Sequence, residues 1–137
     1  MRARDFILES SDRGVIYTKP NFAREWLEAA RYPEFKQLGR AVWMDCAAQG
    51  RVVDWTSLDN VGNVELDLAN LDQDKVRGVA VDVKRNQVEL PIVGQWADGT
   101  LDLIAGNTRI ATLLAQGHNP QVWLVDVPVD KELKNTA

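Results

Sequence analysis

Four consecutive residues, Gly106, Asn107, Thr108 and Arg109, lie where an apolar strand pattern gives way to a helical pattern. The first turn of a helix leaves backbone N–H groups without intrahelical partners, and a glycine before it lets an anion approach them closely. The guanidinium of Arg109 would add a two-pronged donor for phosphate oxygens. These four residues are therefore a candidate phosphate-binding turn.

The same four residues also have a purely structural interpretation. Asn107 or Thr108 would cap the helix, and Arg109 would be a solvated residue of the first helical turn. Their types and spacing do not decide between the two interpretations.

Cysteine and histidine chemistry is restricted, because the chain has one residue of each type, Cys46 and His118. A single cysteine forms no intramolecular disulfide, and the pair is too small for a structural zinc site. Cys46 precedes two alanines in a helical pattern, which is typical of a small buried residue. No protein-held metal is expected.

The composition limits the classes of protein to which the chain can belong. The 137 residues are 45% hydrophobic, enough for one ordinary domain, and 16 basic against 20 acidic residues give a net charge of −4. Such a balance disfavours a protein that neutralises DNA phosphates over a broad surface, so no strong binding to duplex DNA is expected. The charged N-terminus resembles neither a signal peptide nor a membrane span, which predicts a cytoplasmic protein without membrane contact.

The first sixty residues have helical patterns. One helix is predicted between Pro20 and Pro33, with Asn21 as its cap, and a second from Pro33 to Gly50. Segment 51–63 is rich in turn-forming residues and is predicted to be a connection. The sequence thus predicts an N-terminal helical extension over 1–60.

The remaining residues, 61–137, are predicted to form an α+β core. The valine-rich helix is assigned on helical spacing, since its apolar residues recur three and four positions apart. The predicted elements are a strand at 64–68, a helix spanning 76–83, a hairpin of 89–96 and 100–105 around Asp98 and Gly99, a helix at 108–116 ended by Gly117, and a strand at 121–127.

The segment "LPIVGQWADGTLDLIAGNTRIATLLAQGHNPQVWLVDVP" resembles the core of the ParB/sulfiredoxin-like superfamily, and the wider resemblance runs from Val64 to Pro128. In that family a Gly-x-x-Arg turn with a small residue two positions on begins a helix on nucleotide phosphates; the matching residues are Gly106, Arg109 and Ala111. The resemblance implies a mixed sheet and a bound nucleotide, such as ATP with Mg²⁺. With its helical N-terminal part, the chain resembles uncharacterised proteins of tailed phages of marine bacteria, which implies the host cytoplasm.

Asp72 and Asp74 are the candidate catalytic residues. By resemblance to serine-kinase-like relatives, the helix start after the first strand lies beside the glycine turn and supplies an acid near the substrate. Such a carboxylate would orient or deprotonate an acceptor hydroxyl. Acids are also favoured in a first helical turn by the helix dipole alone, so a structural role is the alternative.

Departures from the family restrict the activity. The turn lacks the cysteine and histidine of sulfiredoxins, Thr108 stands where partitioning proteins carry an arginine, and Ala105 replaces the acid of the serine-kinase-like branch. One hypothesis is an ATP-dependent phosphotransferase or nucleotide hydrolase that binds a nucleotide or another phosphorylated small molecule. The other is a non-catalytic phage accessory protein that binds a host protein through its tryptophan-rich helical part. The charge balance disfavours the third, a nuclease or DNA-binding protein.

Overall fold

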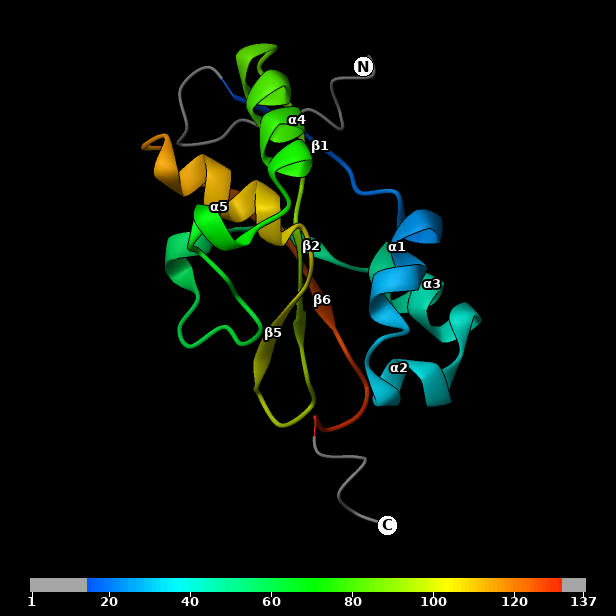
Figure 1. Cartoon of the computed structure of the whole chain (residues 1–137). Helices are drawn as coiled ribbons and strands as arrows, with labels where there is room; N and C mark the ends of the chain where they lie inside the picture. The colour runs from blue at the N-terminus through cyan, green and yellow to red at the C-terminus, as the bar shows by residue number, and fades with distance from the viewer. Residues whose placement is uncertain (1–14, 132–137) are drawn as a thin grey trace.

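The structure, a computed structural model, describes residues 15–131 (Figure 1). Its elements in chain order are β1 (Ile16–Thr18), α1 (Phe22–Ala29), α2 (Pro33–Leu38), α3 (Arg40–Ala48), β2 (Arg51–Asp54), the 3-10 turns η2 (Trp55–Ser57) and η3 (Leu68–Asn70), α4 (Gln73–Lys84), β3 (Gln87–Glu89), β4 (Ile92–Gln95), β5 (Leu101–Ala105), α5 (Asn107–Ala115) and β6 (Gln121–Asp126).

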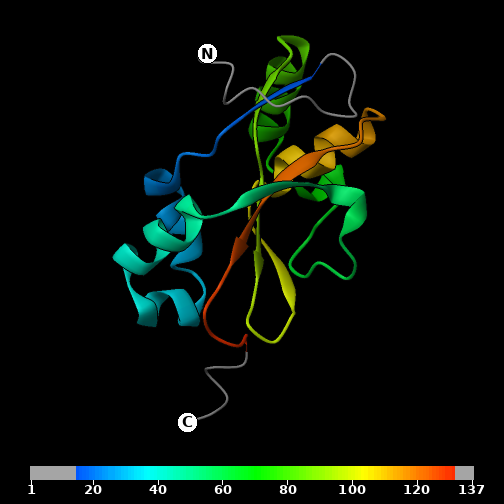
Figure 2. The ribbon, with the colours of Figure 1, turned by 180° about the vertical axis from the view of Figure 1, so that it is seen from behind.

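The centre of the molecule is a mixed sheet of four strands in the order β2-β6-β4-β5. β4 pairs antiparallel with β5 and parallel with β6, while β2 runs antiparallel to β6, as Figure 2 shows from behind. β1 and β3 form a separate parallel pair. The mixed α+β class predicted from the sequence is confirmed.

Helices cover both faces of this sheet because its strands alternate their apolar side chains between two cores. One core joins α1, α2 and α3 to residues such as Ile92 and Val125, and the other joins α5 to Val93, Val122 and Leu124. A third cluster packs α4 and α5 against the β1–β3 pair. The residues around the start of α5 belong to all three clusters: Ala105 to the first core, Ile110 to the second and Leu113 to the third cluster.

The N-terminal helical segment differs from the prediction in three places. Residues 16–18, predicted to be part of a helical extension, form strand β1 and pair with β3. The single helix predicted over 33–50 is divided at Gly39, whose φ of 95° interrupts the helix between α2 and α3. Segment 51–63, predicted to be a connection, begins with β2, because pairing with β6 supplies the backbone partners that local sequence does not reveal. The domain boundary at residue 60 stays a prediction.

The strand predicted at 64–68 is wrong. Residues 64–67 have no regular structure and the chain turns into η3 at Leu68. The side-chain amide of Asn107 takes the place of a neighbouring strand, since it accepts from the N–H of Glu65 at 2.7 Å and donates to its carbonyl at 2.8 Å. The carboxylate of Asp67 then caps η3 through the N–H of Ala69.

The other predicted elements from residue 73 onward are confirmed. α4, the β4–β5 hairpin, α5 and β6 lie within a few residues of their predicted bounds, and Gly99 and Gly117 have the positive φ angles that their turns require. Asn21 caps α1 by accepting from the N–H of Arg24. Within residues 15–131, no helix is long and apolar enough to cross a membrane.

All five tryptophans contribute to packing. Trp43 and Trp96 are buried, and the other three are half-buried. The indole N–H of Trp43 donates to the carbonyl of Phe22, and that of Trp123 donates to the carbonyl of Ala47. The tryptophan side chains therefore do not form an exposed patch on the helical part.

Among the buried polar groups, the carboxylate of Glu34 is unsatisfied at both of its oxygens. The Glu34 side chain on α2 is fully buried, and neither carboxylate oxygen has a hydrogen-bond partner in the described part of the chain. A buried polar group without a partner destabilises the folded state.

We expect Glu34→Met to raise the free energy of unfolding by about 1–3 kcal/mol, because it removes that penalty at similar side-chain length. Gln37→Met, at an exposed position of the same helix, should change it by less than about 0.5 kcal/mol. Urea denaturation measures both variants. A marked loss of stability in Glu34→Met would show that the carboxyl group makes a stabilising contact.

Candidate functional site

The turn that begins α5 requires glycine at position 106. Gly106 is left-handed, with φ 96° and ψ 24°, and it occupies the N-cap position. A Cβ atom there would lie 2.7 Å from Cβ of Pro91 and 3.1 Å from Cζ of Arg109. The turn is thus closed tightly by both neighbours.

Neither Asn107 nor Thr108 caps α5, so that interpretation of the sequence is wrong. The helix begins at Asn107, and no side chain caps it in the described structure. Asn107 instead holds the backbone of Glu65. The first N–H groups of α5 therefore have no capping side chain among the described residues.

Arg109 is not the solvated side chain of the structural interpretation, since its side chain is only 17% exposed. Its Nη1 donates to the carbonyls of Glu89 at 3.1 Å and Leu90 at 3.2 Å, and Nη2 donates to the carboxylate of Glu25 at 3.3 Å. The guanidinium thus joins α5 to α1 and to the backbone between β3 and β4.

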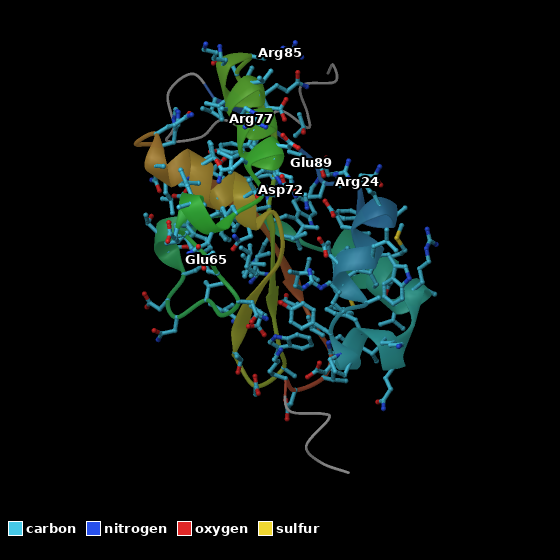
Figure 3. All side chains as sticks on the ribbon, in the orientation of Figure 1. Arg24, Glu65, Asp72, Arg77, Arg85 and Glu89 are labelled. Carbon is cyan, nitrogen blue, oxygen red and sulfur yellow. The ribbon has the colours of Figure 1, made fainter. Side chains whose placement is uncertain are left out.

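A second arginine completes this arrangement. Arg24 donates to the carboxylates of Glu25 and Glu89, and the pair of Arg24 and Glu89 is labelled in Figure 3. Hydrogen bonding to Glu89 raises the pKa of the Arg24 guanidinium. We call Arg24, Glu25, Glu89 and Arg109 the arginine–glutamate cluster. Its two positive and two negative charges compensate each other.

The cluster forms one end of a cleft of about 570 Å³ between α1, α4 and the start of α5. Charged side chains of both signs line the cleft together with the backbone of the α5 turn. The charged residues are Arg24, Glu25, Glu28, Arg31, Lys75, Asp82, Glu89 and Arg109.

Internal ion pairs account for most of these charges. Glu28 pairs with Arg31 at 3.2 Å, and the arginine–glutamate cluster accounts for four more. Within residues 15–131, Lys75 and Asp82 are the charged lining residues with no ion pair or side-chain hydrogen bond. Sequence reasoning missed both residues, although the seven-residue separation that places them on one face of the predicted helix was visible.

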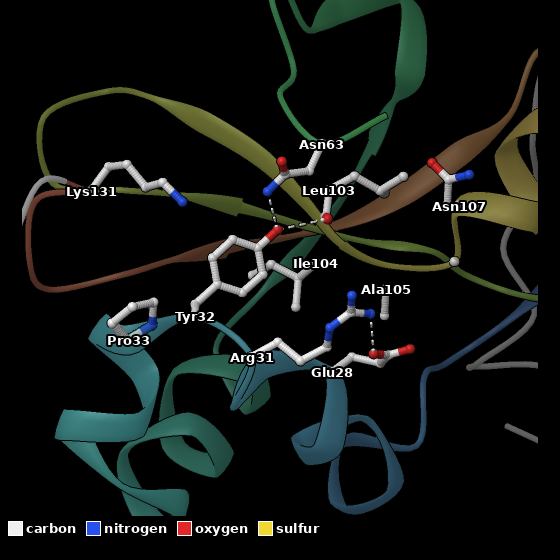
Figure 4. Close-up of a pocket in the computed structure, with 11 residues that line it drawn as sticks. Glu28, Arg31, Tyr32, Pro33, Asn63, Leu103, Ile104, Ala105, Asn107 and Lys131 are labelled. Carbon is white, nitrogen blue, oxygen red and sulfur yellow. Dashed lines mark hydrogen bonds and ion pairs between the residues drawn. The ribbon is translucent and has the colours of Figure 1, made fainter. Parts of the chain in front are cut away.

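A second hollow, of about 530 Å³, lies along β5 and shares Glu28, Arg31, Gly106 and Asn107 with the cleft (Figure 4). Tyr32 forms its wall by donating to the carbonyl of Leu103 and accepting from the amide of Asn63. Burial raises the pKa of the Tyr32 phenol, which keeps it neutral as a donor. The two hollows meet at the α5 turn.

The structure does not bring Asp72 and Asp74 into the cleft. The carboxylate of Asp72 is the N-cap of α4 and accepts from the N–H groups of Asp74 and Lys75. The side chain of Asp74 is 86% exposed and pairs with Arg77. The acids that do line the cleft are Glu25, Glu28, Asp82 and Glu89.

No group of three or more histidine, cysteine or carboxylate side chains in the described residues is arranged to hold a metal ion. Cys46 is half-buried on α3, and burial raises the pKa of its thiol, which disfavours the reactive thiolate. The site's chemistry is therefore that of backbone N–H groups and charged side chains.

We expect Gly106→Ala to destabilise the protein by about 1–3 kcal/mol more than Gly117→Ala. Both variants place a side chain at positive φ, but only the first meets other atoms, because nothing lies within 4 Å of a Cβ at Gly117. Urea denaturation of the two variants measures the difference. Equal losses would contradict the close approach of Pro91.

Arg109→Ala should lower the free energy of unfolding by about 2–3 kcal/mol, because it removes one of the two arginine donors to the buried carboxylate of Glu25 and the guanidinium donor to two carbonyls. The matched control is Arg77→Ala, which breaks an exposed ion pair with Asp74 and should cost less than about 0.5 kcal/mol. Thermal denaturation with circular dichroism compares them. Similar small losses would show that the arginine–glutamate cluster is not structural.

Comparison with known proteins adds no relative: no protein-family model matches the chain, and neither the curated proteins nor the solved structures contain a match.

Proposed function

We propose that the chain is a binding protein of ParB/sulfiredoxin-like fold that holds the phosphate group of a small molecule at the start of α5. The observation that carries the proposal is the uncapped turn from Gly106 to Arg109 in a cleft that also contains Lys75, whose ammonium group has no described ion-pair partner. Backbone N–H groups at a helix start and an adjacent cation are the donors that phosphate oxygens prefer.

The size of the site supports a ligand larger than phosphate. The cleft and the hollow along β5 measure about 570 Å³ and 530 Å³, each within the range of small-molecule sites, and they meet at Gly106 and Asn107. A nucleotide or another phosphorylated small molecule fits this space. Magnesium would enter with the phosphates, because the described side chains form no metal site.

The proposal is binding without catalysis by Asp72 or Asp74. A general base must lie within hydrogen-bond reach of the hydroxyl that it deprotonates. Asp72 is used as a helix cap, and Asp74 pairs with Arg77 away from the cleft lining. Their positions agree with the structural alternative, the first-turn preference of acids.

The alternative of binding a host protein through the tryptophan-rich helical part has no observation in its favour. Of the three tryptophans within residues 1–60, Trp26 and Trp43 pack into the core that joins α1, α2 and α3 to the sheet, and Trp55 packs against the core on the α5 side. Phosphate recognition remains the better-supported function.

Thermal shift with phosphate, tripolyphosphate, ATP and sugar phosphates tests the proposal, each with and without magnesium. A compound at 100 times its dissociation constant should add about 2.7 kcal/mol of stability. Lys75→Ala should weaken binding at least about tenfold while the fold stays intact, since its side chain is exposed. Lys84→Ala, at the other end of α4 and outside the cleft, is the control. Absence of any shift, or equal weakening by both variants, would refute the proposal.

A further inference from the structure

A glycine lies in the middle of α4, on the wall of the cleft. Gly78 lines the cleft with Lys75, Val79 and Asp82, and these residues fall on one face of the helix. Glycine weakens a helix interior relative to alanine, so its presence there calls for a local reason.

Packing within the protein does not supply that reason. Gly78 is helical, with no positive φ that would require glycine, and no other atom outside the helix backbone lies within 4 Å of a Cβ built at this position. Gly106 differs, because Pro91 and Arg109 close in on it. The missing side chain at Gly78 leaves open space on the cleft side of α4.

The two uncompensated charges of the cleft flank this space. Lys75 lies three residues before Gly78 and Asp82 four residues after it, which separates their Cα atoms by about 10 Å along the helix axis. A carboxylate without a partner accepts hydrogen bonds from hydroxyl or amino groups and repels phosphate. The α4 wall is therefore suited to a ligand that is anionic at one end and a hydrogen-bond donor at the other.

We infer that Gly78 and Asp82 select a phosphate ester over free phosphate: Gly78 gives room to the organic part of the ligand, and Asp82 accepts hydrogen bonds from its hydroxyl or amino groups. This inference rests on the proposed function, in which Lys75 and the α5 turn hold the phosphate. In this inference, the residues of α4 determine which phosphorylated compounds bind.

Calorimetry with four compounds tests it: phosphate and its ester ribose 5-phosphate, and tripolyphosphate and its ester ATP. In the unmodified protein, at least one ester should bind at least about tenfold more tightly than its matched inorganic anion. Gly78→Leu should abolish that advantage without changing the affinity for the inorganic anion. Asp82→Asn should also reduce the advantage, while affinity for the inorganic anion stays constant or rises.

Two controls separate bulk in the cleft from effects on the fold. Val81→Leu adds bulk to an exposed position of α4 outside the cleft and should leave all affinities unchanged. Gly78→Ala should raise the melting temperature by a few degrees, because alanine favours the helix and meets no neighbour. A lower melting temperature in Gly78→Ala would overturn the inference, since it would give the glycine a structural role.

The outcomes distinguish the two levels of the proposal. If no compound binds, the proposed phosphate site fails and the inference falls with it. If the inorganic anions bind and neither ester binds more tightly, or if Gly78→Leu weakens inorganic anion and ester equally, the phosphate site stands and the role of Gly78 is refuted.

Discussion

The guanidinium of Arg109 joins parts of the chain that are far apart in sequence. It binds a carboxylate of α1, 84 residues away, and two carbonyls on the backbone between β3 and β4. Because the acceptors are largely buried, their charge and dipoles need this donor in the folded state. The helical N-terminal part, the sheet and α5 thus share one electrostatic contact at the lining of the cleft.

Gly106 and Asn107 determine the shape of the turn at the start of α5, the first by its small size and the second by its hydrogen bonds. Gly106 permits the close approach of Pro91, which holds the α5 turn against the entrance to β4. Asn107 uses its amide on the backbone of Glu65 and so ties the irregular loop to the same turn. The side chains of Asn107 and Arg109, which the sequence suggested for ligand binding, therefore hold the turn in place within the protein.

The sequence predicted the elements whose signals are local. The periodicity of α4, the Asp98–Gly99 turn and the cap at Asn21 are all found in the structure. It did not predict β2, which is defined by its partner β6, nor the loop at 64–67, where a side-chain amide replaces a strand. At the site, the sequence predicted the strand-to-helix turn that the structure contains, but the carboxylates around Arg109 come from α1 and β3, and only tertiary packing brings such distant residues together.

The β4–β5 hairpin depends for its counterion on Lys131, a residue that is synthesised after it. The carboxylate of Asp102, in the middle of β5, is 5% exposed, and it accepts from the indole of Trp96 at 2.8 Å and from the ammonium of Lys131 at 3.0 Å. That ammonium also lies over the rings of Tyr32 and Trp96. The hairpin can form its turn as it leaves the ribosome, but its buried charge acquires this counterion only after residue 131 has emerged. The buried charge of the hairpin is therefore compensated by a residue that lies beyond the last strand of the sheet.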